Sequence, residues 1–291
     1  MSYSLRGKHC IVTGATGSIG FRIAAAFAEQ GSVVSLVSRS APDARAKLEP
    51  QLVPFKPDPD TYDSEDPPPS AHRFLHLDGT RPVAFQGFFG ATAGRADILV
   101  NCAGISQTSF LRRTYDSDIT KILETNLRAT ILACKYARMK HNGMYNTAYL
   151  QLHYLTLILQ GCIINISSLM ANKDGAGASV YAASKAGVVA FTRALTTEFR
   201  PRSIRVNALL PGWIESQMWD GALRPCEKEV NVDVQHPVLD LLPNIKNKYL
   251  EECPAHRAGT PDEVADATIF LAKNQFANNC VLNLDGGLSA T

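Results

Sequence analysis

Short apolar runs alternate with stretches of helical periodicity along most of the chain. Strand-like runs occur at His9–Thr13, Ser32–Val37, Phe74–Leu77, Ala96–Asn101, Cys162–Ser167, Ile204–Leu210 and Val281–Leu284. Helical periodicity is found at Phe21–Gln30, Asp118–Met139, Ala182–Phe199 and Pro261–Leu271. This alternation predicts an α/β fold of the Rossmann type, with a doubly wound parallel sheet and helices on both faces. The ligand site of such a fold lies beyond the carboxyl ends of the strands.

Three stretches interrupt the alternation, and we interpret them as insertions in a single domain spanning residues 1–291. Pro50–Ala71 holds seven of the sixteen prolines and five acidic residues, which favours an extended, mobile surface loop. Asn142–Gln160 contains three tyrosines and a Leu/Ile cluster, and is expected to be a packed extra helix or an interface for a partner. Glu215–Pro254 follows the end of a strand, where it could cover the site as a substrate lid.

Composition narrows the function classes. The chain has 29 Lys and Arg against 27 Asp and Glu, so a net charge of +2 provides no general field for nucleic acid or an acidic membrane. Its seven cysteines are scattered without a Cys-x-x-Cys pair, which argues against a disulfide framework or a zinc site. We expect no metal. No apolar run reaches the ~18–20 residues of a membrane helix, so we expect no membrane-spanning segment. A strand-like run already starts at His9, so we expect no cleavable targeting segment before it. The expected location is the cytoplasm, with mitochondria as the alternative.

A glycine-rich turn joins the first strand to the first helix. It reads Thr13-Gly14-Ala15-Thr16-Gly17-Ser18-Ile19-Gly20. Glycines let a backbone approach a pyrophosphate, and a helix N-terminus supplies N–H groups and partial positive charge. The turn therefore predicts a dinucleotide site, with the cofactor-binding residues Gly14, Thr16, Gly17, Ser18, Ile19 and Gly20.

The end of the second strand indicates which dinucleotide binds. An NAD enzyme places an acid near this position to bind the ribose 2′-hydroxyl, whereas an arginine accommodates a 2′-phosphate. Here the strand ends in Val37-Ser38-Arg39, without an acid. The sequence thus favours NADP(H), although Arg39 could also be a solvated surface residue. Asp78, after the third strand, could accept a hydrogen bond from adenine or cap a turn.

Tyr181 and Lys185 stand one helical turn apart on one face of a predicted helix. Such a pair is weak evidence, since about 0.4 are expected by chance and Tyr136 and Lys140 form a second one. Context separates the two, because a strand ends at Ser168, thirteen residues before Tyr181.

Together these motifs resemble the short-chain dehydrogenase/reductase family, in its single-domain branch. The matching set is the glycine loop, Asn101-Cys102-Ala103-Gly104, Asn126, Ser168, Tyr181, Lys185, Pro211-Gly212 and Asp285-Gly286-Gly287, in the family's order. Within the family, Ser179–Thr197 and Ile204–Gly212 are most similar to β-ketoacyl-carrier-protein reductases and related carbonyl reductases. The resemblance implies that Asn101, Ala103, Gly104, Pro211, Gly212, Ile214 and Ser216 contact the cofactor.

The resemblance also implies catalytic roles. Tyr181 donates a proton to the substrate oxygen, Ser168 orients the carbonyl, and Lys185 binds the nicotinamide ribose. Asn126 positions a water that links Lys185 to solvent. For proton exchange near neutral pH the pKa of a tyrosine must fall from about 10 to near 7, which is roughly 4 kcal/mol. An ammonium ~5 Å away supplies about 3 kcal/mol at an effective dielectric near 20, so Lys185 is expected to lower the pKa of Tyr181.

The chain departs from the branch at a few positions. Gly17 and Ser18 resemble the loop of longer-chain members, and Asn278-Asn279 replace a common Thr-Gly pair. The leading hypothesis is an NADPH-dependent ketoreductase acting on a 3-oxoacyl thioester. Basic residues that could attract a carrier, or simply form a solvated face, are Arg112, Arg113, Arg128 and Lys135. The alternatives are a carbonyl or secondary-metabolite ketone reductase and a non-catalytic cofactor-binding subunit. By resemblance, we expect a homodimer or homotetramer.

Overall fold

A computed structural model describes residues 3–58, 60, 67–107, 109–140, 161–173, 175, 177–216 and 249–290. Its main feature is a seven-stranded sheet in the order β3-β2-β1-β5-β7-β8-β9, with every pair parallel. The strands are β1 His9–Thr13, β2 Val33–Ser38, β3 Arg73–His76, β5 Ile98–Asn101, β7 Gly161–Ile166, β8 Ile204–Pro211 and β9 Val281–Leu284. All seven predicted strands are present, and the predicted fold class is confirmed.

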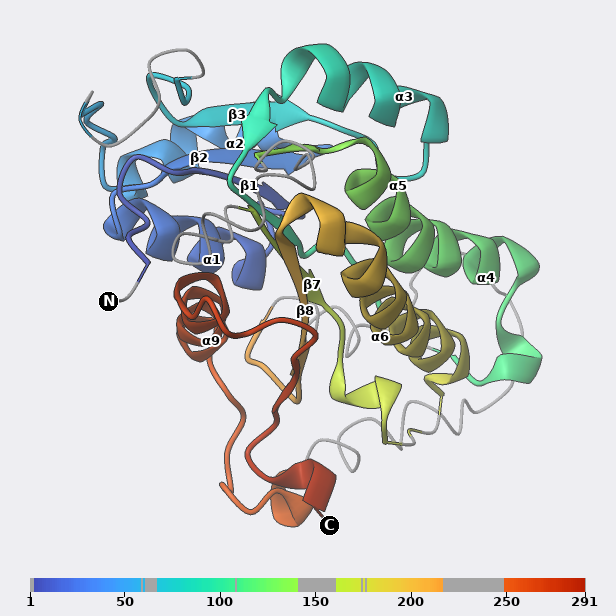
Figure 1. The fold of residues 1–291 in the computed structure, drawn as a ribbon. Helices are drawn as coiled ribbons and strands as arrows, with labels where there is room; N and C mark the ends of the chain where they lie inside the picture. The colour runs from blue at the N-terminus through green and yellow to red at the C-terminus, as the bar shows by residue number, and fades with distance from the viewer. Residues whose placement is uncertain are drawn as a thin grey trace.

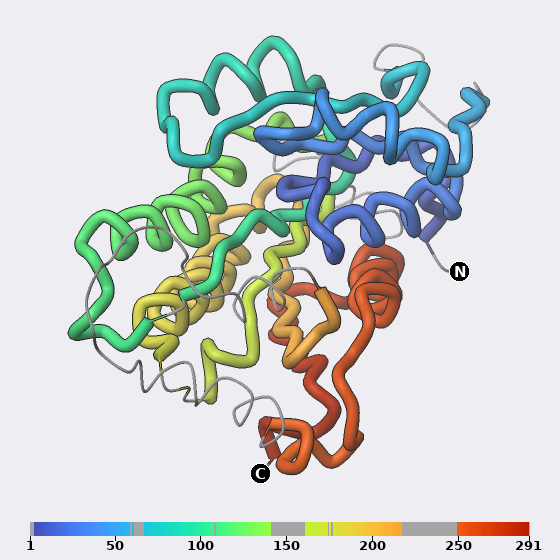
Figure 2. The backbone as a smooth tube through the Cα atoms, turned by 180° about the vertical axis from the view of Figure 1, so that it is seen from behind, coloured from blue at the N-terminus to red at the C-terminus, as the bar shows by residue number. Residues whose placement is uncertain are grey.

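Helices cover both faces of this sheet (Figures 1 and 2). The α-helices whose bounds lie wholly among the described residues are α1 Ser18–Glu29, α2 Ala41–Leu48, α3 Pro82–Gly87, α4 Asp116–Leu123, α5 Ala129–Tyr136, α6 Ser179–Phe199 and α9 Pro261–Lys273. Helices α1, α2 and α9 pack in one apolar core, and α3, α5 and α6 in the other. Among these helices, none combines the length and apolar character needed to cross a bilayer.

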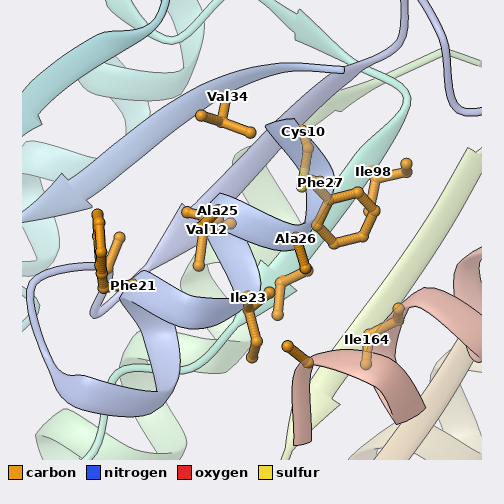
Figure 3. Packing of buried hydrophobic residues seen from close by; sticks show 14 of the residues in the cluster. Cys10, Val12, Phe21, Ile23, Ala25, Ala26, Phe27, Val34, Ile98 and Ile164 are labelled. Carbon is orange, nitrogen blue, oxygen red and sulfur yellow. The ribbon is translucent and has the colours of Figure 1, made fainter. Parts of the chain in front are cut away.

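The alternation of side chains along each strand builds the two cores. In β1, Cys10 and Val12 face α1, whereas Ile11 faces the opposite core. Figure 3 shows Phe27 of α1 beside Cys10 and Ile98. Strands β1, β2, β5, β7 and β8 are buried on both faces, so their sequences are nearly continuous apolar runs, which is why they were predictable.

The predicted helix over Asp118–Met139 differs from the structure at its middle and its end. A π-helical turn, Glu124–Arg128, lies between α4 and α5. The helix ends at Tyr136, and Arg138–Met139 form the short strand β6, which pairs with β4, Arg95–Ala96. Helical periodicity continues through these residues, but Lys140 N–H donates to the Ala96 carbonyl and draws the chain into strand pairing. The sequence pattern also did not predict the short helices α2 and α3.

Of the three predicted insertions, the first is described at residues 50–58, 60 and 67–71. The first begins with a 3-10 turn, Glu49–Gln51, and then runs irregularly. Its start is anchored, because Leu52 is buried and the Val53 carbonyl accepts a hydrogen bond from His72. The predicted helix or interface at 142–160 lies outside the described residues, as does most of the predicted lid. Of that lid, residues 215–216 and 249–254 are described.

A buried histidine at the start of β1 predicts an acid-sensitive fold. His9 is fully buried, its Nδ1 donates to the Arg95 carbonyl and its Nε2 accepts from the Ser35 hydroxyl. Burial, reinforced by the nearby Arg73 charge, lowers the pKa of His9 to about 4. The unfolded chain therefore binds a proton near pH 6.5 that the folded chain does not, so stability falls as the pH drops from 6.5 towards 4.

We expect about 2 kcal/mol of this loss between pH 6.5 and pH 5. Denaturant unfolding at the two pH values measures it. His9→Gln should lower the stability at both pH values but remove this difference between them. His76→Gln, which removes an exposed imidazole, should retain the wild-type difference. Equal pH dependence of wild type and His9→Gln would contradict the prediction.

Candidate active site

A cavity of about 680 Å³ lies at the carboxyl ends of the central strands. It gathers loops that follow β1, β2, β3, β5, β7 and β8. The predicted site residues that line it are Gly14, Thr16, Gly17, Ser18, Ile19, Gly20, Arg39, Asp78, Ala103, Gly104, Ser168, Tyr181, Lys185, Pro211, Gly212, Ile214 and Ser216. Residues from across the chain thus meet in one place.

The glycine-rich turn forms a cradle that larger side chains would fill. Gly14 has a φ of +67°, and a Cβ there would lie 2.7 Å from the backbone of Ala103. A Cβ on Gly20 would lie 2.4 Å from the Gly14 carbonyl oxygen. Helix α1 begins after Gly17 without a side-chain cap or an acid in its first turn. This arrangement fits the pyrophosphate of a dinucleotide.

Hydroxyl groups cluster around Arg39 at one end of this cradle. Thr16 Oγ1 lies 3.0 Å from both Ser38 Oγ and Ser40 Oγ, and all four residues line the cavity. One cation with three hydroxyls is a donor set suited to a phosphate group. Ser38 and Ser40 were not predicted as cofactor contacts, although they flank Arg39 directly in the sequence.

Asp78 caps a turn in this structure. Its Oδ1 accepts hydrogen bonds from Thr80 N at 3.0 Å and from Thr80 Oγ1 at 2.8 Å. The backbone bond from Thr80 is the main cause that lowers the pKa of Asp78, and Arg39 adds to it. The turn-capping alternative is therefore confirmed, and the contact with adenine stays a prediction.

The three predicted catalytic side chains lie together further along the cavity. Helix α6 presents Tyr181 and Lys185, and Ser168 follows β7. The Ser168 and Tyr181 side chains both line the cavity, near enough that the Ser168 hydroxyl acts on the pKa of Tyr181. Lys185 Nζ donates to the Ile166 carbonyl at 2.9 Å and lies 5.8 Å from the centroid of the Tyr181 ring. Ser167 Oγ also donates to the Lys185 carbonyl at 2.7 Å, which fixes α6 against the end of β7.

The protonation states differ from the sequence-based expectation. Burial raises the pKa of Tyr181 above its usual value, and the hydrogen bond with Ser168 opposes that rise only in part. Burial also lowers the pKa of Lys185 to about 8. The expected fall of the Tyr181 pKa to near 7 is therefore not found in this structure, where burial outweighs the lowering and the Lys185 ammonium donates to the Ile166 carbonyl. Tyr181 keeps its proton at neutral pH, as a proton donor requires.

Two of the predicted site residues lie behind the cavity wall. Asn126, in the π-turn, is fully buried; its Oδ1 accepts from Ile105 N, and its Nδ2 donates to the Ile105 carbonyl and Ser184 Oγ. Asn101 does not line the cavity, which corrects its place among the cofactor contacts. It is the last residue of β5, and its side chain points into the core, where it donates to Asn165 Oδ1. Both asparagines hold the wall in place rather than form it.

The remaining wall near Tyr181 is largely apolar and was not foreseen. Phe110, Leu169, Met170, Trp213 and Tyr249 line it, and the rings of Trp213 and Tyr249 lie 5.0 Å apart. Trp213 could have been found, since it follows Pro211-Gly212 directly. The others come from segments whose sequences contain no recognisable motif. An apolar wall beside a proton donor suits a substrate with a hydrocarbon portion.

Comparisons with known proteins agree with this geometry. The family model described as enoyl-(acyl carrier protein) reductase matches residues 68–289. The 3-oxoacyl-(acyl-carrier-protein) reductase FabG of Chlamydia muridarum is 31% identical, with 99% of this chain and 100% of that protein covered. Carbonyl reductase family member 4 of Xenopus laevis is 31% identical over 97% of this chain and 98% of its own.

Solved structures are similar as well. The ligand-free aldohexose dehydrogenase of Thermoplasma acidophilum has a TM-score of 0.69 and 27% identity, over 100% of this chain and 97% of that one. These relatives differ in substrate, so what they share is the scaffold and the kind of reaction.

Proposed function

Because the chain belongs to the short-chain dehydrogenase/reductase family, we propose that it reduces the ketone of a 3-oxoacyl thioester to a secondary alcohol with NADPH. It is an oxidoreductase that acts on CH–OH and C=O groups with a nicotinamide cofactor. The observation that carries the finer proposal is that Ser168, Tyr181 and Lys185 meet in one cavity beside an apolar wall. The thioester substrate class is suggested by two similar proteins, both named 3-oxoacyl-(acyl-carrier-protein) reductase FabG.

The residues divide into cofactor and proton roles. The cradle of Gly14, Gly17 and Gly20 would hold the pyrophosphate, and the group at Arg39 the 2′-phosphate of a nicotinamide dinucleotide, which supplies the hydride when bound. Tyr181 donates its phenolic proton to the substrate oxygen. Ser168 donates its single hydroxyl hydrogen to the same oxygen and holds it in line.

Lys185 supports the proton transfer from the buried side of the cavity. Its ammonium lies close enough to the Tyr181 ring to stabilise the phenolate formed once the proton has left. A Cβ on Gly104 would lie 3.3 Å from Lys185 Nζ, so only a very small residue leaves the ammonium room at this point. The water relay through Asn126 stays a prediction.

The preference for NADPH predicts a clear effect of one substitution. Arg39→Asp removes the cation from the hydroxyl cluster and places a carboxylate there. We expect the ratio of kcat/KM with NADPH to that with NADH to fall about 100-fold, since charged hydrogen bonds contribute about 1.5–3 kcal/mol and repulsion adds to their loss. Arg45→Asp makes the same charge change on α2, outside the cavity, and should leave the ratio unaltered. An unchanged ratio in Arg39→Asp would refute the NADPH assignment.

The substrate class is tested by NADPH consumption with an acetoacetyl thioester. Turnover supports the 3-oxoacyl reductase. Turnover of small diketones or quinones alone would favour the carbonyl reductase alternative. The similarity to proteins named carbonyl reductase family member 4 supports this alternative. Binding of NADPH without turnover of any ketone would favour a non-catalytic subunit. The homodimer or homotetramer is tested by sedimentation, and the cytoplasmic location stays a prediction.

A further inference from the structure

Helix α6 carries Tyr181 in its first turn but has no capping side chain of its own. Its N-cap is Ala178, which has no side chain able to accept a hydrogen bond, and Gly175 and Gly177 precede it. The first N–H groups of a helix have no partner within the helix and require acceptors from elsewhere. The local sequence therefore leaves open how the turn that holds Tyr181 is fixed.

Gln107 supplies the missing acceptor from the loop after β5. Its Oε1 accepts from Val180 N at 2.7 Å and from Tyr181 N at 3.2 Å. These are the second and third residues of α6, whose N–H groups an N-cap side chain ordinarily satisfies. Gln107 is only 8% exposed, so water does not easily replace it. The cap comes from 73 residues earlier in the chain.

The other half of the same amide fixes its orientation. Gln107 Nε2 donates to the Ser109 carbonyl at 2.8 Å and to Thr114 Oγ1 at 3.2 Å. A carbonyl oxygen can only accept, so the nitrogen must face Ser109 and the oxygen must face the helix. Phe110, in the same loop, lines the cavity. The Gln107 side chain thus links the loop that lines the cavity to the first turn of α6, which holds Tyr181.

The carbonyl of Tyr181 is held to the same loop by a second route. Ser184 Oγ donates to the Tyr181 carbonyl at 2.6 Å, and Asn126 Nδ2 donates to Ser184 Oγ at 3.1 Å. Asn126 in turn bonds both backbone groups of Ile105. Residues 105 and 107 therefore fix the backbone of Tyr181 at both its N–H and its C=O.

We propose that Gln107 is a positioning residue that sets the phenol of Tyr181 for proton transfer by capping α6 from the β5 loop. The inference rests on the proposed function, because it concerns the same proton transfer. It predicts that loss of the amide oxygen misplaces the phenol relative to Ser168. It also predicts that the glycine cradle, which belongs to other elements, keeps its affinity for NADPH.

The first experiment compares two caps. Gln107→Met keeps the approximate shape but removes the acceptor, and we expect kcat with acetoacetyl thioester to fall about tenfold or more, as small misplacements of a catalytic group do. The dissociation constant of NADPH should change less than threefold. The control is Thr260→Val, which removes the N-cap oxygen of α9, where Thr260 and Glu263 form a capping box. It should lower the unfolding midpoint similarly but leave kcat unchanged.

A second variant separates positioning from stability. Gln107→Glu retains an acceptor for Val180 and Tyr181, so it should recover most of the kcat lost in Gln107→Met. Its carboxylate disfavours a nearby phenolate, so the pH profile of kcat should shift to higher pH. A kcat of Gln107→Met within twofold of wild type, or a Gln107→Glu variant that neither recovers kcat nor shifts the profile, would overturn the proposal.

A spectroscopic test needs no substrate. The 13C resonance of Tyr181 Cζ, assigned by its disappearance in Tyr181→Phe, should move in Gln107→Met and stay in place in Thr260→Val. If it stays in place in both, the positioning role is wrong. If wild type reduces no ketone, the proposed function fails, and this resonance alone decides whether Gln107 positions the phenol.

Discussion

Tyr181→Phe is expected to lower kcat by about 10²–10⁴-fold while the dissociation constant of NADPH changes less than threefold. The substitution removes one hydroxyl, the proposed proton donor, which lines the cavity together with Ser168 and the apolar wall. General acid catalysis contributes factors of this size. The cradle that would hold the cofactor is formed by other elements, so binding should remain. Steady-state NADPH oxidation and a fluorescence titration measure the two quantities.

The chain contains its own control for this experiment. Tyr136 stands four residues before Lys140, the same spacing as Tyr181 and Lys185, but it packs at the edge of the core behind the sheet and does not line the cavity. Tyr136→Phe should keep wild-type kcat. A Tyr181→Phe variant with more than a tenth of wild-type activity would show that another group, or water, donates the proton.

The raised pKa of Tyr181 predicts how the rate of ketone reduction depends on pH. Because burial holds that pKa above its usual value, the phenol remains protonated throughout the neutral range. Reduction should thus not slow through loss of this proton as the pH rises to 8 or 9. Lys185, with a pKa of about 8, loses its charge there, so a decline in that range would report the lysine. Lys185→Met should remove such a decline.

The central strands were predictable because they are buried on both faces, which leaves a nearly unbroken apolar run in the sequence. Features set by long-range contacts were not predictable in this way. The strand β6 exists because its backbone pairs with β4, and the side chain of Asn101 turns inward because it ends β5 beside β7. Neither fact changes the local periodicity, so a single sequence shows neither.

The site was predictable to the extent that its residues form short motifs. Gly14, Ser168 and Lys185 stand in such motifs, whereas Gln107 and Tyr249 come from segments whose sequences contain no recognisable motif. Asn279 illustrates a departure that the structure explains. It has a φ of +59°, a region that glycine favours but asparagine tolerates, and the preceding Asn278 accepts a hydrogen bond from Val206 N. The Asn pair therefore replaces the family's Thr-Gly without disturbing the turn.

Gly20→Ala is expected to lower the free energy of unfolding by about 3 kcal/mol or more and to weaken NADPH binding at least tenfold. The added Cβ would lie 2.4 Å from the Gly14 carbonyl oxygen and 2.9 Å from its carbon, both backbone atoms. Gly14 cannot retreat, since it already packs against the backbone of Ala103. Helix α1 must therefore shift away from the turn, and overpacking of this kind costs about 1–3 kcal/mol even where flexible side chains can yield.

Gly17→Ala is the matched control in the same turn. A Cβ on Gly17 meets only the Gly14 carbonyl oxygen, at 3.5 Å, and its φ of −77° suits any residue. We expect its stability in urea, measured without cofactor, to stay within about 1 kcal/mol of wild type. Equal destabilisation by the two substitutions would mean that the turn yields as a whole. In that event the bound cofactor would determine the conformation of the cradle, and the close contact between Gly14 and Gly20 would not.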